Sequence, residues 1–532
     1  MDEPTQTDVN PQGGIIMANS PSEPAKPPVF PESFPQAPAP TTETFVIPPS
    51  VPENAPPVPP ANAPPINPFI PQGVVPAQTQ GNTRAPAGRS AGSPIKKLLM
   101  ILLFLLLLGG FIFGGLFLFR KVQGPKEVTL TYWGLWEEDA VVRSVLSDFE
   151  AKNPKVKVQY VKNSHQEYRE RLQAAINRGD GPDVFRFHNT WIPMLRNELA
   201  TAPEGFMTAS DFASTFYPVA SADLVAGQSI FGVPMMIDGL GLYYNEELFA
   251  TAGVTPPTTW EEVLGIVPKL TVKASDGSIV TSAIALGTTG NIEHFSDILA
   301  VMMMQNGVKL TNPTGKPAEE ALIFYRKFAD PSDPVYTWND SLDNSVYAFV
   351  TGRVAMILAP SWRAFEITDL AKNNGKELRF KIVPVPQLPG NTVSWASYWV
   401  EGVSSKTKNP KEAWDLVKFM TSKETVAKLY TEAGKTRLFG EPYARLDMAG
   451  SVESDPYVGA FVAQGAHARS FPLASRTFDN GLNDRMIKYL VDAVNGVNQG
   501  TAPGAVLETL KNGFDQVLGS FGLSTGTAPA SP

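Results

Sequence analysis

The stretch FGVPMMIDGLGLYYNEELFATAGVTPPTTWEEVLGIVPKL, residues 231–270, carries the most informative signals in this 532-residue chain. Asn245 stands where it can cap a short helix, and Gly253 is the residue type that ends a helix in a left-handed conformation. Thr259 and Glu262 have the spacing of a capping box, and apolar residues follow at helical spacing. We therefore predict a strand, a polar crossing and two helices, so that the chain leaves one compact unit and starts another.

Strand and helix signals alternate from Glu127 onward. Alternating apolar residues predict a strand over 128–132, helical spacing predicts a helix over 168–178, and a buried strand is predicted over 184–187. This alternation favours an α/β architecture with a largely parallel sheet. Ligands of such sheets gather outside the carboxyl ends of the strands, which points to residues 134–137 and 188–191, the loops that follow these two strands.

The second half of the chain continues the alternation. Residues 354–358 predict a buried strand that leads into a polar loop. A helix is predicted after Asn409, with Pro410 at its first position and Glu412 completing a second capping box. Two further helices are predicted near the C-terminus, over 485–497 and 505–518.

The composition excludes several classes of protein. The sequence contains no cysteine, so disulfides, thiolate catalysis and Cys-rich zinc sites are ruled out. The formal net charge of -8 argues against a nucleic-acid partner, because phosphate neutralisation needs clustered Lys and Arg. The four histidines have no metal-ligand spacing, and no phosphate-binding loop or hydrolase motif occurs. We expect no catalytic residue, metal or cofactor.

Two segments precede the predicted globular part. Residues 1–95 are rich in Pro and small polar residues, and we predict a disordered tail that is either a spacer or a recruiter of partners. Residues 98–119 carry no charge and are long enough to span a bilayer as a helix, so we assign 96–121 to one transmembrane helix. This segment is too long and starts too late for a signal peptide. The last residues, 524–532, are expected to be disordered.

Five motifs occur in an order that resembles one family of transport proteins, the extracellular solute-binding proteins of sugar ABC importers, which include the maltodextrin-binding proteins. The motifs are VTLTYWGLW from Val128, GDGPDVF from Gly179, Gly-Val-Pro followed by Leu-Tyr-Tyr-Asn within 231–270, FVTGRVAMILAPSWR from Phe349, and NPKEAWDLVKFMTS from Asn409. Together they cover roughly residues 127–523.

The resemblance implies a two-lobed periplasmic-binding-protein-like fold of type II with three interlobe crossings. The expected ranges are about 127–237 and 387–430 for lobe 1 and about 239–385 and 435–523 for lobe 2, with the third crossing near 429–434. It also implies an extracellular binding domain that serves ABC permease subunits, and we expect this domain to be monomeric. We therefore expect a single-pass protein of the cell membrane with a cytoplasmic tail, an orientation that the flanking charges favour only slightly.

A neutral sugar presents apolar C–H patches and hydroxyls, so its cleft needs exposed aromatic rings beside polar side chains. The resemblance implies that Asp238 is a hinge carboxylate that binds hydroxyls and that Trp362 stacks on the ligand. Asp238 can instead form a turn, and Arg363 is suited either to vicinal hydroxyls or to a surface ion pair. The predicted ligand-binding set is completed by loop and strand-end residues: Trp136, Glu137, His188, Asn189, Tyr398, Trp399 and Arg437.

The resulting hypothesis is a membrane-tethered solute-binding protein that binds a carbohydrate and is not an enzyme. One alternative is a tethered carbohydrate-active hydrolase with Glu137 and Asp238 as its acid pair, which requires carboxyl groups roughly 5 to 9.5 Å apart. Others are a solute sensor and a binder of a polyamine or a peptide. Asp183, in GDGPDVF, is predicted to be structural, because its carboxylate can accept hydrogen bonds from nearby backbone N–H groups.

Overall fold

The computed structural model describes residues 98–100, 102–110 and 127–523. The predicted N-terminal tail and C-terminal end lie outside these residues, as does part of the predicted transmembrane segment. Residues 98–100 and 102–110 are helical. Within the described ranges, no helix combines the length and the apolar composition needed to cross a membrane.

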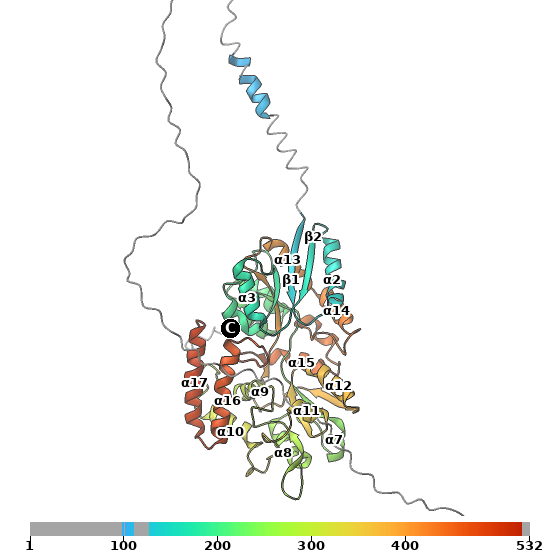
Figure 1. Ribbon diagram of the computed structural model, residues 1–532, viewed down its shortest axis with the longest axis vertical. Coiled ribbons are helices and arrows are strands. Elements are labelled where there is room, and N and C mark those ends of the chain that lie inside the picture. The colour runs from blue at the N-terminus through green and yellow to red at the C-terminus, as the bar shows by residue number, and fades with distance from the viewer. Residues whose placement is uncertain (1–97, 101, 111–126, 524–532) are drawn as a thin grey trace, which may run out of the picture. The chain divides into compact units, whose positions relative to one another are not determined.

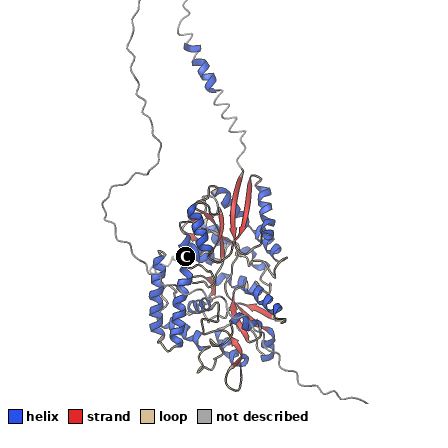
Figure 2. Ribbon diagram, viewed as in Figure 1, coloured by secondary structure: helices blue, strands red, loops and turns tan. Residues whose placement is uncertain are grey.

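The first lobe is built on a mixed six-stranded sheet (Figures 1 and 2). Its strand order is β2-β1-β3-β14-β4, and β7 also pairs with β14; the bounds are β1 Val128–Gly134, β2 Val156–Lys162, β3 Val184–His188, β4 Leu199–Ala200, β7 Val233–Pro234 and β14 Trp399–Ser404. The strand β1 runs parallel to β2 and β3, whereas β14 is antiparallel to β3, β4 and β7. The prediction of a largely parallel sheet is therefore wrong, because β14 enters from the other lobe instead of through a right-handed helical crossover.

Helices cover this sheet and bury its apolar side chains. The longer ones are α2 Asp139–Lys152, α3 Tyr168–Arg178, α13 Pro410–Met420 and α14 Lys423–Ala433, and the shorter ones are α4 Ile192–Leu195, α5 Ala209–Thr215 and α6 Pro218–Leu224. The helix α14 packs on α2, and α13 packs on β14. The predicted third crossing at residues 429–434 therefore falls on the end of a helix of the first lobe, and the chain leaves this lobe later.

The second lobe has its own five-stranded sheet in the order β12-β8-β11-β10-β9. The bounds are β8 Gly241–Asn245, β9 Val272–Lys273, β10 Ile279–Ile284, β11 Val354–Ala359 and β12 Phe380–Val383. Its helices are α7 Glu246–Ala252, α8 Trp260–Leu270, α9 Phe295–Gln305, α10 Lys316–Lys327, α11 Ser345–Val350, α12 Arg363–Asn373 and α15 Gly459–Gln464, with the C-terminal pair α16 Leu482–Asn498 and α17 Pro503–Ser520 (Figure 1). The α16–α17 pair packs on α10.

Two of the segments that connect the lobes touch one another. The first runs from β7 to β8 through Asp238, and the second runs from β13, Ser394–Trp395, into β14. Gly239 forms a bridge with Ala396, and the Ser397 N–H donates to the Asp238 carbonyl at 2.9 Å. A Cβ on Gly239 would lie 1.8 Å from the Trp395 carbonyl oxygen, so this close approach requires glycine.

The local signals in residues 231–270 are confirmed. The Asn245 side chain accepts from two backbone N–H groups at the start of α7, Gly253 has a φ of 63°, and Thr259 and Glu262 form a capping box on α8. The chain returns to the first lobe later than the expected lobe-1 range of 387–430 implies, because Gln387 still pairs with Thr259 of the second lobe and β14 begins only at Trp399.

The second predicted capping box, at Asn409, is wrong. The Asn409 side chain makes no capping hydrogen bond, although it precedes α13. Its backbone, with φ -128° and ψ 55°, lies outside the extended conformation that directs an N-cap side chain at the helix. The Asn409 N–H instead donates to the Thr407 hydroxyl at 3.1 Å.

Candidate functional site

A cavity of about 600 Å³ is lined by residues from both lobes. The first lobe contributes the loop after β1, the end of β3 and the start of β14. The second lobe contributes the segment after β11, the helix α12 and parts of α9. A cavity of this size is in the range of small-molecule binding sites, so we treat it as the candidate ligand site.

The wall from the first lobe is aromatic. Trp136 is 38 % exposed, and its ring lies 5.3 Å from His165 and 5.7 Å from Trp399 between ring centroids. The Trp399 ring in turn lies 5.2 Å from the His188 ring at a steep angle. These neighbours fix the indole of Trp136 and leave part of it open to the cavity.

His188 is held as a neutral hydrogen-bonding group. His188 Nδ1 accepts from the Thr190 N–H at 3.4 Å and therefore carries no proton, so the Thr190 hydroxyl, 2.8 Å away, donates to it as well. That leaves His188 Nε2 to donate to Ser397 Oγ at 3.1 Å. Burial lowers the pKa of His188 to about 3, because the charged form would lose its hydration.

The wall from the second lobe is centred on Trp362, which is also 38 % exposed. The Arg363 guanidinium lies 4.2 Å from the Trp362 ring centroid, a cation–π contact, and His294 meets the ring edge-on at 5.9 Å. Arg363 is itself 1 % exposed and forms ion pairs with Glu293 and Glu366. Its role in the structure is therefore to support Trp362 from behind the cavity wall.

A hydrogen-bonded chain fixes the loop that follows β15, Ala468–Arg469. Arg363 Nε donates to His294 Nε2 at 3.2 Å, so the His294 proton lies on Nδ1 and is donated to Ser475 Oγ at 2.8 Å. The Ser475 hydroxyl then donates to the Asp297 carboxylate. Residues 475–478 line the cavity beyond this anchor.

Asp238 lines the cavity, but its carboxylate is engaged by the protein. One oxygen accepts from the Gly239 and Ser361 N–H groups at 2.8 and 3.0 Å, and the other accepts from Ser361 Oγ at 2.8 Å. Burial raises the pKa of Asp238 to about 7. The hydrogen bonds from Ser361 and Gly239 favour the charged form and lower the pKa, but burial has the larger effect. This carboxyl therefore ties the first crossing to the segment after β11.

The structure divides the ten predicted ligand-binding residues into two groups. Six of them line the cavity: Trp136, His188, Asp238, Trp362, Trp399 and Arg437. The other four are not among the lining residues: Glu137, Asn189, Arg363 and Tyr398.

Asn189 and Tyr398 belong to the interior of the first lobe. The Asn189 amide and the Tyr398 hydroxyl both donate to Asp223, at 2.8 and 2.7 Å. Successive strand residues point to opposite sides, so Tyr398 and Trp399 cannot both face the cavity. Asp183 has the structural role expected, since its carboxylate accepts from the Thr131 N–H at 2.9 Å.

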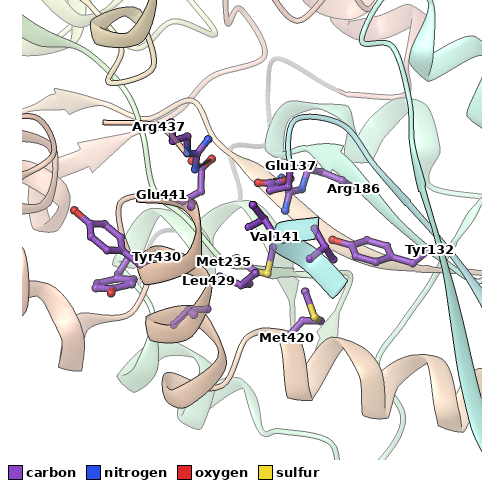
Figure 3. Close-up of a pocket in the computed structure, with 14 residues that line it drawn as sticks. Tyr132, Glu137, Val141, Arg186, Met235, Met420, Leu429, Tyr430, Arg437 and Glu441 are labelled. Atoms are coloured by element: carbon purple, nitrogen blue, oxygen red, sulfur yellow. Dashed lines mark hydrogen bonds and ion pairs between the residues drawn. The ribbon is translucent and has the colours of Figure 1, made fainter. Parts of the chain in front are cut away.

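Glu137 lies at a second, much smaller cavity of about 30 Å³ (Figure 3). Arg186 Nη1 contacts both Glu137 carboxylate oxygens at 2.7–2.8 Å, and Arg186 Nε donates to Glu401 at 2.7 Å. Burial alone would raise the pKa of Glu137, but the Arg186 guanidinium holds it below its ordinary value. Burial raises the pKa of Glu401 despite the same arginine. The three side chains join β14 and β3 to the loop after β1.

Arg437 and Glu441 line both cavities and form an ion pair at 2.8 Å. Figure 3 shows this pair facing Glu137 and Arg186 across the small cavity. The pair belongs to the segment between α14 and α15, which connects the lobes for the third time within the described residues.

Sequence reasoning missed His294 and the loop formed by residues 475–478, all of which line the cavity. The sequence Ser-Arg-Thr-Phe carries no turn or motif signal. Trp395, on β13, also lines the cavity. The sequence predicts a loop that faces the lobes at this position, although Trp395 is not in the predicted ligand-binding set.

Two lobes that each hold a sheet, joined by repeated crossings beside one cavity, define a two-lobed periplasmic-binding-protein-like fold. The profile of the bacterial extracellular solute-binding proteins matches residues 144–438, more than half of the chain, and the chain belongs to this family. It is 25 % identical over 332 residues to the multiple sugar-binding protein of Streptococcus mutans, covering 59 % of this chain and 76 % of that protein.

Solved structures share the fold. The chain superposes with a TM-score of 0.60 on a cyclo/maltodextrin-binding protein complexed with maltotetraose, at 17 % identity, over 74 % of this chain and 98 % of that one. It superposes with a TM-score of 0.59 on the sugar-binding protein MalE of Xanthomonas citri, at 20 % identity, over 74 % and 98 % of the two chains.

Proposed function

We propose that this protein binds a sugar or oligosaccharide in the cavity of about 600 Å³ and delivers it to the permease of an ABC importer. The observation that carries the proposal is the pair Trp136 and Trp362. They lie on opposite lobes, line the same cavity and are each 38 % exposed. Half-exposed indoles supported from one side are suited to the apolar C–H face of a pyranose ring.

The polar groups around these indoles support a neutral ligand. His188 is neutral, and four of the five carboxylates that line the cavity are hydrogen-bonded or ion-paired within the protein: Asp238, Asp297, Glu366 and Glu441. The fifth, Asp369, has no such partner among the described residues. A polyamine carries several ammonium groups and would need more than one carboxylate without a partner. The sugar-binding names of the Streptococcus mutans and Xanthomonas citri relatives agree with a carbohydrate.

Binding is proposed to act through the lobes. A sugar that contacts Trp136 and Trp362 together stabilises the arrangement in which the lobes are close, because only that arrangement offers both contacts. The closed form would dock on the permease and release the ligand as the transporter cycles.

We also propose that the binding domain is extracellular, as its family is, and is tethered to the membrane by residues 98–119. The support is the 22-residue uncharged sequence, which matches the roughly 30 Å thickness of a hydrocarbon core. Protease treatment of intact cells tests this directly. Digestion of the domain after residue 127, with a protected fragment that contains residues 98–119, is expected; an intact domain would refute an external tether.

The hydrolase alternative requires Glu137 and Asp238 as an acid pair across one cleft. Glu137 is bound to Arg186 at the small cavity and does not line the larger one, whereas Asp238 lines the larger one and is bound to Ser361. The two carboxyls therefore do not flank one ligand site. The proposal is therefore binding without turnover.

Titration calorimetry of the full chain, in a detergent without a sugar head group, tests the binding function. A panel of maltose, maltotriose, maltotetraose, a polyamine and a peptide is titrated, and the recovered ligand is analysed for cleavage. A saturable sugar signal with unaltered sugar is expected, and sugar at about 100 times its Kd should add roughly 2.7 kcal/mol to the stability. Binding of the polyamine or peptide alone, or release of shorter sugars, would refute the proposal.

A further inference from the structure

The loop from Ser475 to Asn480 combines an unusual backbone with a position at the cavity. Arg476, Phe478 and Asn480 have φ values of 62°, 50° and 46°, in the left-handed region that residues other than glycine seldom adopt. Glu167 is the one further such residue in the described part of the chain. Two of these three loop residues, Arg476 and Phe478, line the cavity.

The residues between them hold this conformation in place. Thr477 and Asp479 are buried, and the Asp479 carboxylate accepts from the Gly481 and Asn483 N–H groups at 2.9 and 3.0 Å. The Arg169 side chain of α3 donates to the Asp479 carbonyl at 2.7 Å. An unfavourable backbone that its surroundings enforce so firmly is typical of residues placed for function.

Arg476 is directed to the cavity and has little to bind within the protein. Its side chain is 43 % exposed, and its nearest carboxylate, Glu293, lies 3.4 Å away and already pairs with Arg363. It makes no hydrogen bond to any other residue of the described ranges. Its guanidinium lies 5.1 Å from the Phe478 ring, which in turn lies 5.0 Å from His165 of the first lobe. The donors of Arg476 are thus held beside the aromatic wall.

We propose that Arg476 is a specificity-determining residue whose guanidinium donates two hydrogen bonds to neighbouring hydroxyls of the bound sugar. The planar fork of donors fits a pair of vicinal hydroxyls better than any single-point donor does. A neutral sugar is favoured over an acidic one, because more acids than arginines line the cavity and Glu293 lies next to Arg476. The inference rests on the proposed sugar-binding function and deepens it.

Arg476→Gly tests the inference, because glycine accepts the backbone conformation and removes only the side chain. The full chain is titrated calorimetrically with the tightest-binding sugar of the panel and with its monodeoxy analogues. The variant is expected to bind roughly tenfold or more weakly, as for loss of a charged donor, while its Tm without ligand is unchanged or higher. At least one monodeoxy analogue should bind the native protein more weakly than the parent sugar does. The variant should bind this analogue and the parent sugar with equal affinity, because the hydrogen bond to the missing hydroxyl is already lost.

Asn480→Gly is the matched control, because it relieves the same left-handed backbone strain at a residue that does not line the cavity. This variant should bind the sugar as tightly as the native protein does. Equal affinities and equal deoxy penalties for the native protein and Arg476→Gly would overturn the inference and leave sugar binding intact. A native protein that binds no sugar would overturn the proposed function and this inference with it. Tight binding of a uronic acid alone would overturn the inference that the ligand is a neutral sugar.

Discussion

Trp362 illustrates how a single side chain is prepared for a ligand at the scale of the residue. Arg363 and His294 pack against it and are themselves fixed by ion pairs and hydrogen bonds. A ligand that stacks on this ring therefore orders little that is not already ordered, which preserves affinity.

Trp362→Ala is expected to weaken sugar binding by about 1.5–3 kcal/mol, or roughly 10- to 150-fold in Kd, because the buried apolar contact is lost. Titration calorimetry on the full chain measures the change. Tyr347→Ala is the control, since Tyr347 on α11 is 43 % exposed and lies outside the cavity lining. An equal loss in both variants would show that the effect is not local to the cavity.

Asp238 gives the protein a specific dependence on pH. Its pKa of about 7 exceeds the ordinary value, so the folded state holds the proton more tightly than the unfolded chain does. Its contribution to stability is therefore present at acid pH and is lost as the pH rises through about 7. Asp238→Asn keeps the two bonds to Oδ1 and can donate to Ser361 Oγ.

Urea unfolding at pH 4.5 and pH 8 should therefore find the Asp238→Asn variant similar to the native protein at the lower pH. At pH 8 the variant should be more stable by about 1–4 kcal/mol. The difference between the two proteins isolates this carboxyl from the other acids that titrate in the same range. The same difference at both pH values would contradict the assignment.

At the scale of the element, the sequence predicted helix ends only where side chain and backbone agree. Thr259 has the extended backbone of an N-cap, with φ -127° and ψ 157°, and its capping box forms. Asn409 has an equally favourable sequence but a different backbone, set by the turn at Thr407, and its side chain does not cap. Residue type alone does not carry that information.

Thr259→Ala is accordingly expected to destabilise the fold by about 1 kcal/mol, whereas Asn409→Ala should change it by less than about 0.5 kcal/mol. Urea unfolding compares the two variants directly. Equal losses would mean that the Asn409 side chain caps α13 in solution.

The pairing of Arg186 with Glu137 and Glu401 holds neighbouring strands of the first sheet together. Arg186→Ala would leave two carboxylates buried without their cation, and a loss of about 3–5 kcal/mol in unfolding free energy is expected. Arg353→Ala serves as the control, because its ion pair with Asp343 is exposed and should contribute no more than about 1 kcal/mol. A loss of that small size for Arg186→Ala would mean that water reaches the buried carboxylates.

At the scale of the whole molecule, the sequence predicted the two-lobed α/β fold but not the cavity in detail. The first crossing was visible because Gly-Val-Pro and a capped helix mark it in the sequence. The loop at residues 475–480 is held at the cavity by residues more than a hundred positions away: Asp297 accepts from the Ser475 N–H, and Arg169 donates to the Asp479 carbonyl. Tyr398 and Trp399 were both predicted to bind the ligand, although only Trp399 lines the cavity. Their side chains point in opposite directions, and the sequence alone does not show which of the two faces the cavity.

Gly239 permits the first two crossings to lie in contact. Gly239→Ala would force the crossings apart, and we expect a loss of about 1–3 kcal/mol in stability together with weaker sugar binding. Gly265→Ala is the matched control, because the added methyl on α8 meets no neighbour and should stabilise the helix by about 0.5–1 kcal/mol. Thermal unfolding and sugar titration of both variants measure these effects; unchanged binding in Gly239→Ala would show that the crossings separate without affecting the cavity.

The aromatic wall of the first lobe also has an optical consequence. The Trp136, Trp399 and Trp191 rings follow one another at centroid distances of 5.7 and 5.3 Å, at angles of 72° and 83°. The electronic transitions of indoles this close are coupled. Because the rings are steeply inclined to one another, the coupling gives a circular dichroism signal in the near ultraviolet. Because Trp136 and Trp399 both line the cavity, a ligand that shifts either ring changes the signal of all three, and the protein carries its own label-free reporter of occupancy.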